Sequence, residues 1–501
     1  MQNFLTGLEN VVNAINNYLA DYILIILLIG VGLFFTIRTK FVQVRCFKQG
    51  IKKVFGNLSL NGGAQKKGMS SFQAFTTAVA AQVGTGNIVG ACSAILFGGP
   101  GAIFWMWIIA FFGMATVYSE AVLAQKTKEV DKEGNVQGGP VYYIRKAFTG
   151  KFGKFLAGFF AVAIIIALGF IGSMVQSNSI STAVSGAVAI DGWIIGIIVA
   201  ILSAIIFIGG RKRIASVTEK LVPIMALIYL LAGLIVLCCR ITVLPEAFFM
   251  IFKFAFTPSA IIGGGIGYAL KTAISMGAKR GLFSNEAGMG STPHAHAQAN
   301  VKTPHEQGTA AMIGVFLDTF VVLTMTALIV LTCLYAGNGE IYAISQQALA
   351  EGKDVVTELS NAGYSGNTMV NMAISSLFSS ENVGNIVGSV FVAVCLFFFA
   401  FSTIISWNLF GKINFIYLFG KKSTYIYSIL SVAFIFLGSM LSNSFVWSLS
   451  DLFNYLMVIP NVVALIALSN LVVNEVKTNG KKLNYKEPNQ ALNENIKSQE
   501  K

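Results

Sequence analysis

The sequence predicts an all-α polytopic membrane protein with about 11 transmembrane helices, arranged as two inverted repeats of five helices behind one extra N-terminal helix. Three observations predict this fold: the composition, the succession of apolar segments, and glycine clusters at related places in the two halves. Of the 501 residues, 55% are hydrophobic and 11% are charged, and the mean hydropathy is +0.70. A soluble domain would carry about 25% charged residues. Lipid is therefore the expected solvent for most of the chain.

The apolar segments are long enough to cross a bilayer, which takes about 20 residues per helix. The predicted spans are about 22–37, 72–97, 101–125, 153–186, 191–209, 214–238, 258–280, 306–335, 385–411, 424–441 and 450–473. No small-residue cleavage site follows the first span, so we expect a retained anchor rather than a signal peptide. The predicted parts are 1–67 with the extra helix and a basic loop, 68–240 and 241–475 as the two repeats, and 476–501 as a disordered tail.

The basic residues predict the orientation in the cell inner (plasma) membrane. If the N-terminus lies outside, 31 of the 35 Lys and Arg residues fall in cytoplasmic loops or in a cytoplasmic C-terminal tail. Such a bias is the usual signature of membrane topology. It explains the excess of basic residues better than binding to nucleic acid does, and no GxxxxGK motif for a nucleotide is visible.

Glycine clusters interrupt two of the predicted helices. The first core helix contains Gly84 and Gly86, and its counterpart five helices later contains Gly263, Gly265 and Gly267. Each glycine costs a helix interior about 1 kcal/mol, and a broken helix exposes amides for a carboxylate and carbonyls for a sodium ion. The alternative is that these glycines only allow close helix packing, which fits a single pair better than two symmetric clusters.

Isolated polar side chains within the spans are candidates for ligand contact. Thr403 and Trp407 are four residues apart and therefore share one helix face, while Gln176 lies in an otherwise apolar helix. Gln176 could instead bridge helices, and Trp407 could be an interfacial anchor.

Ionisable residues within spans are functional candidates by default. Glu120 and Lys271 are interpreted as reaching the cytoplasmic interface, whereas the role of Asp318 stays open. Three histidines follow the seventh span, namely His294, His296 and His305. Their spacing alone is a weak metal signal, so we expect no metal site beyond one for sodium.

Two runs resemble the signatures of the alanine or glycine:cation symporter family. They are AAQVGTGNIVG at 80–90 and RGLFSNEAGMGS at 280–291, and the resemblance extends over nearly the whole chain. It implies a LeuT-type fold and symport of a small neutral amino acid with sodium. The second run falls in a predicted cytoplasmic loop, where we expect gating and structural roles rather than substrate contact.

The resemblance also implies the site residues. A substrate carboxylate would be held at the first break by Thr85, Gly86 and Asn87, and the pocket wall would include Gln176, Thr403 and Trp407. Sodium would bind between carbonyls of Ala80 and Val83 and hydroxyls of Ser402 and Thr403. Gly265 stands where the family more usually has an aromatic residue, which implies a larger pocket.

The predicted function is sodium-coupled symport of small neutral amino acids into the cell by alternating access. Alanine and glycine are the expected substrates, with serine or glutamine as additions, and sodium is the coupling ion. A gated ion channel is the alternative, but it would need a continuous polar pore. A membrane-embedded enzyme is a weaker interpretation still, because no paired catalytic residues are visible.

Overall fold

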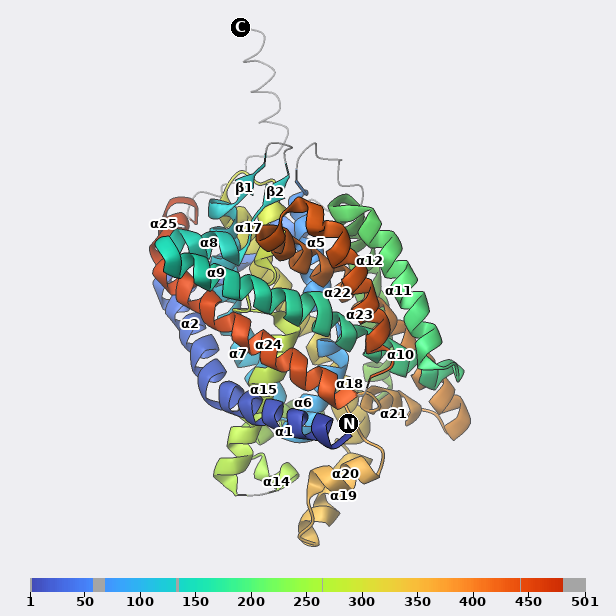
Figure 1. The fold of residues 1–501 in the computed structure, drawn as a ribbon. Coiled ribbons are helices and arrows are strands. Elements are labelled where there is room, and N and C mark those ends of the chain that lie inside the picture. Colours follow the sequence, from blue (N-terminus) through green and yellow to red (C-terminus); the bar gives the residue numbers. More distant parts are fainter. Residues whose placement is uncertain (1, 57–67, 132–134, 264, 442, 481–501) are drawn as a thin grey trace.

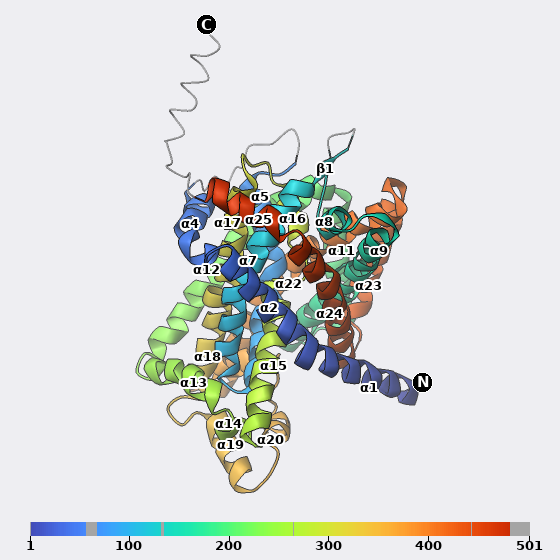
Figure 2. The same cartoon turned by 90° about the vertical axis from the view of Figure 1, so that its left-hand side faces the viewer.

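A computed structural model describes residues 2–56, 68–131, 135–263, 265–441 and 443–480. Within these ranges the chain is a helical bundle, and its only sheet is the short antiparallel pair β1 (Glu129–Val130) and β2 (Val136–Gln137). Figure 1 shows β1, β2 and α25 at one end of the bundle, with α14, α19 and α20 at the other. The same two ends are separated in the rotated view of Figure 2.

The first half of the chain forms the following elements. They are α1 (Gln2–Tyr18), η1 (Leu19–Leu24), α2 (Ile25–Arg38), α3 (Val42–Arg45), α4 (Phe47–Phe55), α5 (Ser71–Gln82), η2 (Gly86–Gly90), α6 (Ala91–Gly98), α7 (Ala102–Thr127), α8 (Pro140–Ala147), α9 (Gly150–Ile164), η3 (Ile165–Gly172), α10 (Ser173–Val188), α11 (Gly192–Ile208) and α12 (Gly210–Cys239). The η1, η2 and η3 segments are π-helical turns, which occur frequently at functional sites.

The second half continues in the same helical manner. Its elements are α13 (Leu244–Phe256), α14 (Ser259–Ile262), α15 (Ile266–Asn285), α16 (Pro293–Gln298), α17 (Pro304–Val315), η4 (Phe316–Leu323), α18 (Thr324–Leu334), α19 (Glu340–Ala350), α20 (Val355–Asn361), α21 (Met369–Ser375), α22 (Glu381–Phe419), η5 (Lys421–Ser423), α23 (Thr424–Gly438), α24 (Asn443–Ala467) and α25 (Ser469–Asn479). Here η4 is π-helical and carries Asp318.

The described residues contain seven helical stretches that are long and apolar enough to cross a membrane. These are Gly7–Arg38, Ala102–Thr127, Gly150–Val188, Gly210–Cys239, Pro304–Leu334, Glu381–Phe419 and Val446–Ala467, and the bent pair Ser71–Gln82 with Gly86–Gly98 makes an eighth if it counts as one span. Each of them overlaps a span expected from the sequence. The chain is thus a multi-pass helical membrane protein, while the total of eleven spans and the inverted repeat stay predictions.

The first break lies where the sequence places it. A capping box, in which Ser70 accepts from the Gln73 amide and the Gln73 side chain accepts from Ser70, starts α5. The helix ends after Gln82, because Val83 leaves the helical conformation with φ −80° and ψ 87°. The two halves of the span then meet at 46°.

The second helix break inside the bundle lies at a different place in the sequence from the one predicted. The glycines at 263–267, of which Gly264 lies outside the described residues, do interrupt the chain between α14 and α15. This interruption lies at the end of the bundle occupied by α14 and α19 (Figure 1). The interruption inside the bundle comes after α15, where Glu286, Gly288 and Gly290 all have positive φ before α16 starts at Pro293.

The predicted loop at 279–302 is therefore mostly helix. Lys279 and Arg280 lie within α15 and pair with Asp21 at 3.4 Å and with Asp451 at 3.5 Å. Lys271 lies near the α14 end of α15 and pairs with Asp21 at 3.0 Å, and its interpretation as a cytoplasmic interface residue stays a prediction. In the predicted tail, α25 continues to Asn479, and residues 481–501 lie outside the described part.

Candidate functional site

Carbonyl oxygens of the first break face two hydroxyls of α22. Thr403 Oγ1 lies 2.8 Å from the Ala80 oxygen and 3.5 Å from the Val83 oxygen. Ser402 Oγ lies 3.5 Å from the same Ala80 oxygen. All four residues are buried. The structure thus brings together the four residues that the sequence predicts as cation ligands, and every polar atom they contribute is oxygen.

Asn87 and Gln176 hold the backbone of this break in place. In a continuous helix the Gly84 amide would donate to the Ala80 carbonyl, but it donates to Asn87 Oδ1 at 3.0 Å. The Thr85 amide donates to Gln176 Oε1 at 3.2 Å. Diversion of the Gly84 amide therefore leaves the Ala80 oxygen free of its helical partner and available to α22.

Two polar atoms next to the break lack partners. Thr85 Oγ1 and Gln176 Nε2 are buried and make no hydrogen bond within the described part of the chain. A buried polar group without a partner costs about 1–3 kcal/mol. A polar ligand that bonded to both atoms would remove this cost, so they mark a place for such a ligand.

The glycines of the break also allow close approach of neighbouring helices. A Cβ on Gly84 would lie 2.5 Å from Thr403 Oγ1. A Cβ on Gly86 would lie 3.0 Å from the Cα of Ser284 at the end of α15. Both interpretations of these glycines, weakness of the helix and close packing, therefore hold at the same positions.

Asp318 on η4 is the centre of a buried hydrogen-bond cluster. Its carboxylate accepts from Asn87 Nδ2 at 2.6 Å, from Ser284 Oγ at 3.0 Å and from Thr319 Oγ1 at 2.8 Å. All of these partners are neutral, and no ion pair to Asp318 exists among the described residues. The cluster joins η2, α15 and η4, so it couples both interrupted helices to a third.

Glu286 occupies the second break and contacts α22. Its carboxylate accepts from Trp407 Nε1 and from Ser291 Oγ, each at 2.5 Å. The Trp407 ring also stands edge-on to Phe283, with 6.0 Å between ring centroids, and a Cβ on Gly172 would lie 2.6 Å from it. Trp407 is thus a buried part of the site rather than an interfacial anchor.

Glu120 on α7 positions the unwound segment. Its carboxylate accepts from the Gly290 amide at 3.0 Å, from the Gly288 amide at 3.4 Å and from Asn461 Nδ2 at 2.6 Å. Asn461 also donates to the Gly288 carbonyl at 2.9 Å. The expectation that Glu120 reaches the cytoplasmic interface is wrong, because this residue is fully buried.

The structure does not bring the second glycine cluster to this site. Gly265 and Gly267 are exposed, and a Cβ on either would meet no atom within 4 Å, while one on Gly263 would meet Leu349 of α19. Glu286 follows Gly265 by 21 residues along α15, which corresponds to about 30 Å at 1.5 Å per residue. The three glycines are therefore not part of the pocket, and the absence of an aromatic side chain at Gly265 does not change the size of the pocket.

Sequence reasoning missed the role of the 280–291 run. Ser284, Asn285 and Glu286 lie in the buried break, where Asn285 accepts from the Ala287 amide at 3.0 Å. The available signal was a glutamate beside two closely spaced glycines in a chain that has few charges. The sequence left the role of Asp318 open, and the structure shows that its carboxylate accepts hydrogen bonds from Asn87, Ser284 and Thr319.

The three histidines have separate partners. His294 hydrogen-bonds to Ser291 O and to Asn414 Nδ2, both at 2.8 Å. His296 bonds to Gln307 at 2.8 Å and His305 to Tyr118 at 2.6 Å. These contacts give each ring a structural role in the bundle.

Several long apolar helices, together with two chain breaks that adjoin buried polar groups, indicate a polytopic transporter as a class. The chain belongs to the sodium:alanine symporter family, whose family model matches residues 5–494. The family predicted from the two runs is therefore confirmed, and with it a symporter of the membrane.

Relatives of known name are similar along nearly the whole chain. The sodium/alanine symporter AgcS of Methanococcus maripaludis is 39% identical, with 93% of this chain and 96% of the relative covered. The amino-acid carrier protein AlsT of Bacillus subtilis is 37% identical, covering 93% and 91%. The probable sodium/glutamine symporter GlnT of the same organism is 37% identical, covering 94% and 90%.

A solved structure has a similar fold. The manganese transporter of Eremococcus coleocola, in a mutant form, superposes with a TM-score of 0.52 over 85% of this chain and 90% of that one. The two sequences are 13% identical, so the likeness concerns the fold alone.

Proposed function

We propose that this chain is a secondary active transporter that carries small neutral amino acids into the cell together with sodium by alternating access. Alanine and glycine are the proposed substrates, with serine and glutamine as further candidates, and relatives named for alanine and for glutamine support this range. The proposed orientation has the N-terminus outside and the C-terminus in the cytoplasm, in line with the distribution of basic residues.

The observation that carries this proposal is the oxygen cluster between the first break and α22. Sodium is a hard cation that takes oxygen ligands, and freed carbonyls at a broken helix are where transporters bind such ions. Ala80, Val83, Ser402 and Thr403 supply these oxygens, with hydroxyl-to-carbonyl distances of 2.8 to 3.5 Å. The unpartnered Thr85 Oγ1 lies on the same break, and Gln176 with its unpartnered Nε2 contacts the break from α10. Gly86 and Asn87 complete the proposed substrate site.

Charge supports the same assignment. Glu286 and Asp318 are buried carboxylates with neutral partners in the described part of the chain. Carboxylates in a membrane interior are costly unless a positive charge or a proton neutralises them. A sodium ion and the ammonium group of an amino acid bring positive charge, while the substrate carboxylate can take the polar atoms of the break.

Counterflow of labelled alanine in proteoliposomes tests the function. We expect exchange that requires sodium and is insensitive to ATP. Sodium flux without alanine, at rates typical of a pore, would instead indicate a channel. The absence of both alanine exchange and sodium flux would refute the proposal.

A further inference from the structure

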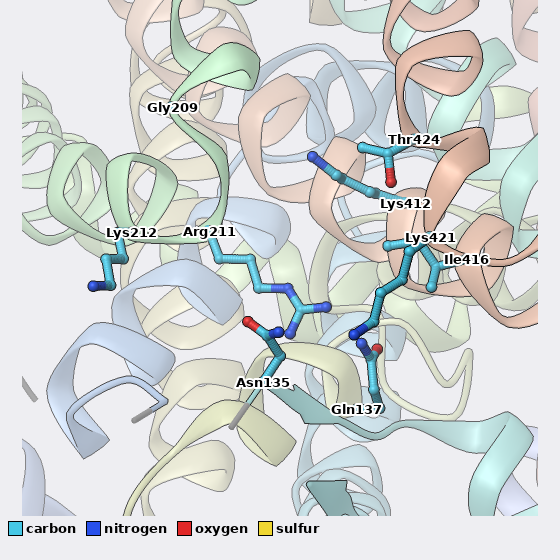
Figure 3. A pocket seen from close by; sticks show the side chains of 9 residues that line it. All are labelled: Asn135, Gln137, Gly209, Arg211, Lys212, Lys412, Ile416, Lys421 and Thr424. Carbon is cyan, nitrogen blue, oxygen red and sulfur yellow. The ribbon is translucent and has the colours of Figure 1, made fainter. Parts of the chain in front are cut away.

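A hollow of about 340 Å³ lies at the β1–β2 end of the bundle, away from the proposed transport site. Figure 3 shows the side chains that line it, from the β hairpin, the start of α12, the end of α22 and the start of α23. The lining residues are Asn135, Gln137, Gly209, Arg211, Lys212, Lys412, Ile416, Lys421 and Thr424. The volume is in the range of small-ligand pockets, which is about 300–1,000 Å³.

Among the described residues, the lining contains four basic side chains and no acidic one. Lys412 makes no ion pair or hydrogen bond within the described ranges. Arg211 donates to the Val136 carbonyl at 2.5 Å and lies 3.4 Å from Gln298 Oε1, both of which are neutral. Two cations of the hollow therefore lack a carboxylate partner among the described residues.

The nearby acid is already engaged. Lys421 pairs with Asp131 at 2.8 Å, and this contact holds the pKa of Asp131 at about 2. Asp131 therefore stays ionised at neutral pH and is committed to Lys421. Its single negative charge does not balance the four basic side chains of the described lining.

The donors match an anion with several oxygens. In Figure 3 the Arg211 guanidinium extends between Asn135 and Gln137, and Lys421 approaches Gln137 from the other side. A guanidinium fork with nearby ammonium and amide groups is the usual donor set for phosphate. The hollow also adjoins the N-terminus of the 30-residue helix α12, whose first amides lack helical acceptors and favour anions.

We propose that this hollow binds a phosphate group, carried by an anionic lipid headgroup or free in the cytoplasm. Basic pockets between membrane helices at the cytoplasmic side are suited to lipid phosphates, and the hollow lies among the ends of α12, α22 and α23. Lys412 follows Trp407 by five residues on α22, or about 7.5 Å along the axis. The bound phosphate therefore contacts the helix that carries part of the proposed transport site.

Thermal unfolding of the purified full-length chain in neutral detergent tests the site. Phosphatidylglycerol in mixed micelles and inorganic phosphate are titrated separately, with phosphatidylcholine and chloride as controls. Lys412→Gln should raise the half-saturating concentration of the active ligand roughly fivefold, the worth of one basic residue at such a surface. Lys220→Gln removes the same charge from an exposed residue of α12 that does not line the hollow, so it should change binding less than about twofold.

The two arms identify the source of the phosphate. Stabilisation by phosphatidylglycerol alone assigns a lipid headgroup, and stabilisation by inorganic phosphate assigns a free ion. If neither stabilises the protein, or if Lys220→Gln weakens binding as much as Lys412→Gln, the proposal is overturned. Arg211→Lys keeps the charge but removes the fork, and it serves as the second variant if Lys412→Gln does not fold.

Discussion

Replacement of Thr403 by valine is the sharpest test of the proposed cation site. The change keeps the branched shape of the side chain and removes only the hydroxyl, which lies 2.8 Å from the Ala80 oxygen and 3.5 Å from the Val83 oxygen. Thr403→Val should therefore remove one proposed sodium ligand without opening a cavity.

The size of the effect follows from the contacts. Loss of one polar partner in a buried site costs about 1–3 kcal/mol, and each 1.4 kcal/mol is about tenfold in binding. The sodium concentration for half-maximal uptake should thus rise between roughly fivefold and a hundredfold. Ser402→Ala should have a smaller effect, because the Ser402 hydroxyl lies 3.5 Å from the Ala80 oxygen and bonds to Phe399 O at 2.8 Å.

Sodium-dependent uptake of labelled alanine into proteoliposomes measures this shift. Thr332→Val is the matched control, because Thr332 is also a buried helix threonine that donates to the carbonyl four residues earlier, at 2.7 Å. Thr403 makes the same kind of bond to Phe399 at 3.0 Å. If both variants alter the sodium dependence equally, or if Thr403→Val leaves it unchanged, Thr403 does not bind the coupling ion.

Three further outcomes are expected. Gly84→Ala should abolish uptake, because the new Cβ would lie 2.5 Å from a hydroxyl of α22, while Gly265→Ala meets no atom within 4 Å and should leave uptake unchanged. By the same reasoning, Gly265→Phe should not alter competition by larger amino acids for alanine uptake. A narrower substrate range in Gly265→Phe would refute the placement of Gly265 outside the pocket. Asp318→Asn should lower the melting temperature by the equivalent of about 1–3 kcal/mol, because an amide offers one acceptor oxygen to three side-chain donors; an unchanged melting temperature would contradict this. In a cysteine-free background, an impermeant thiol reagent applied outside should label a cysteine at Gly363 and miss one at Asn135, and the reverse would overturn the proposed orientation.

The solvent and the spans of this protein could be predicted from the sequence because they depend on local properties. Apolar segments of sufficient length and a shortage of charges require lipid around the helices, and the structure has long apolar helices at the expected places. The first break was also visible, since Gly84 and Gly86 weaken the helix at the point where it ends. The two sequence runs at 80–90 and 280–291 were sufficient to predict the family.

The tertiary structure decided which residues meet at the site. Asp318 and Ser284 are 34 residues apart and belong to different helices, so no local pattern pairs them. The Ala80 carbonyl is free because the Gly84 amide turns to Asn87, and the role of that carbonyl depends on a hydroxyl 323 residues away in the sequence.

The second break shows the limit of the sequence most clearly. The glycine-rich segment at 263–267 is weaker as a helix than the segment at 286–291, yet it is the latter that unwinds inside the bundle. Glu120 accepts a hydrogen bond from the Gly288 amide, and Asn461 donates one to the Gly288 carbonyl, so both groups of this unwound residue have partners. Helix propensity determines where a chain can break, but in a membrane only partners from other helices can satisfy the freed groups, and those partners are fixed by tertiary packing.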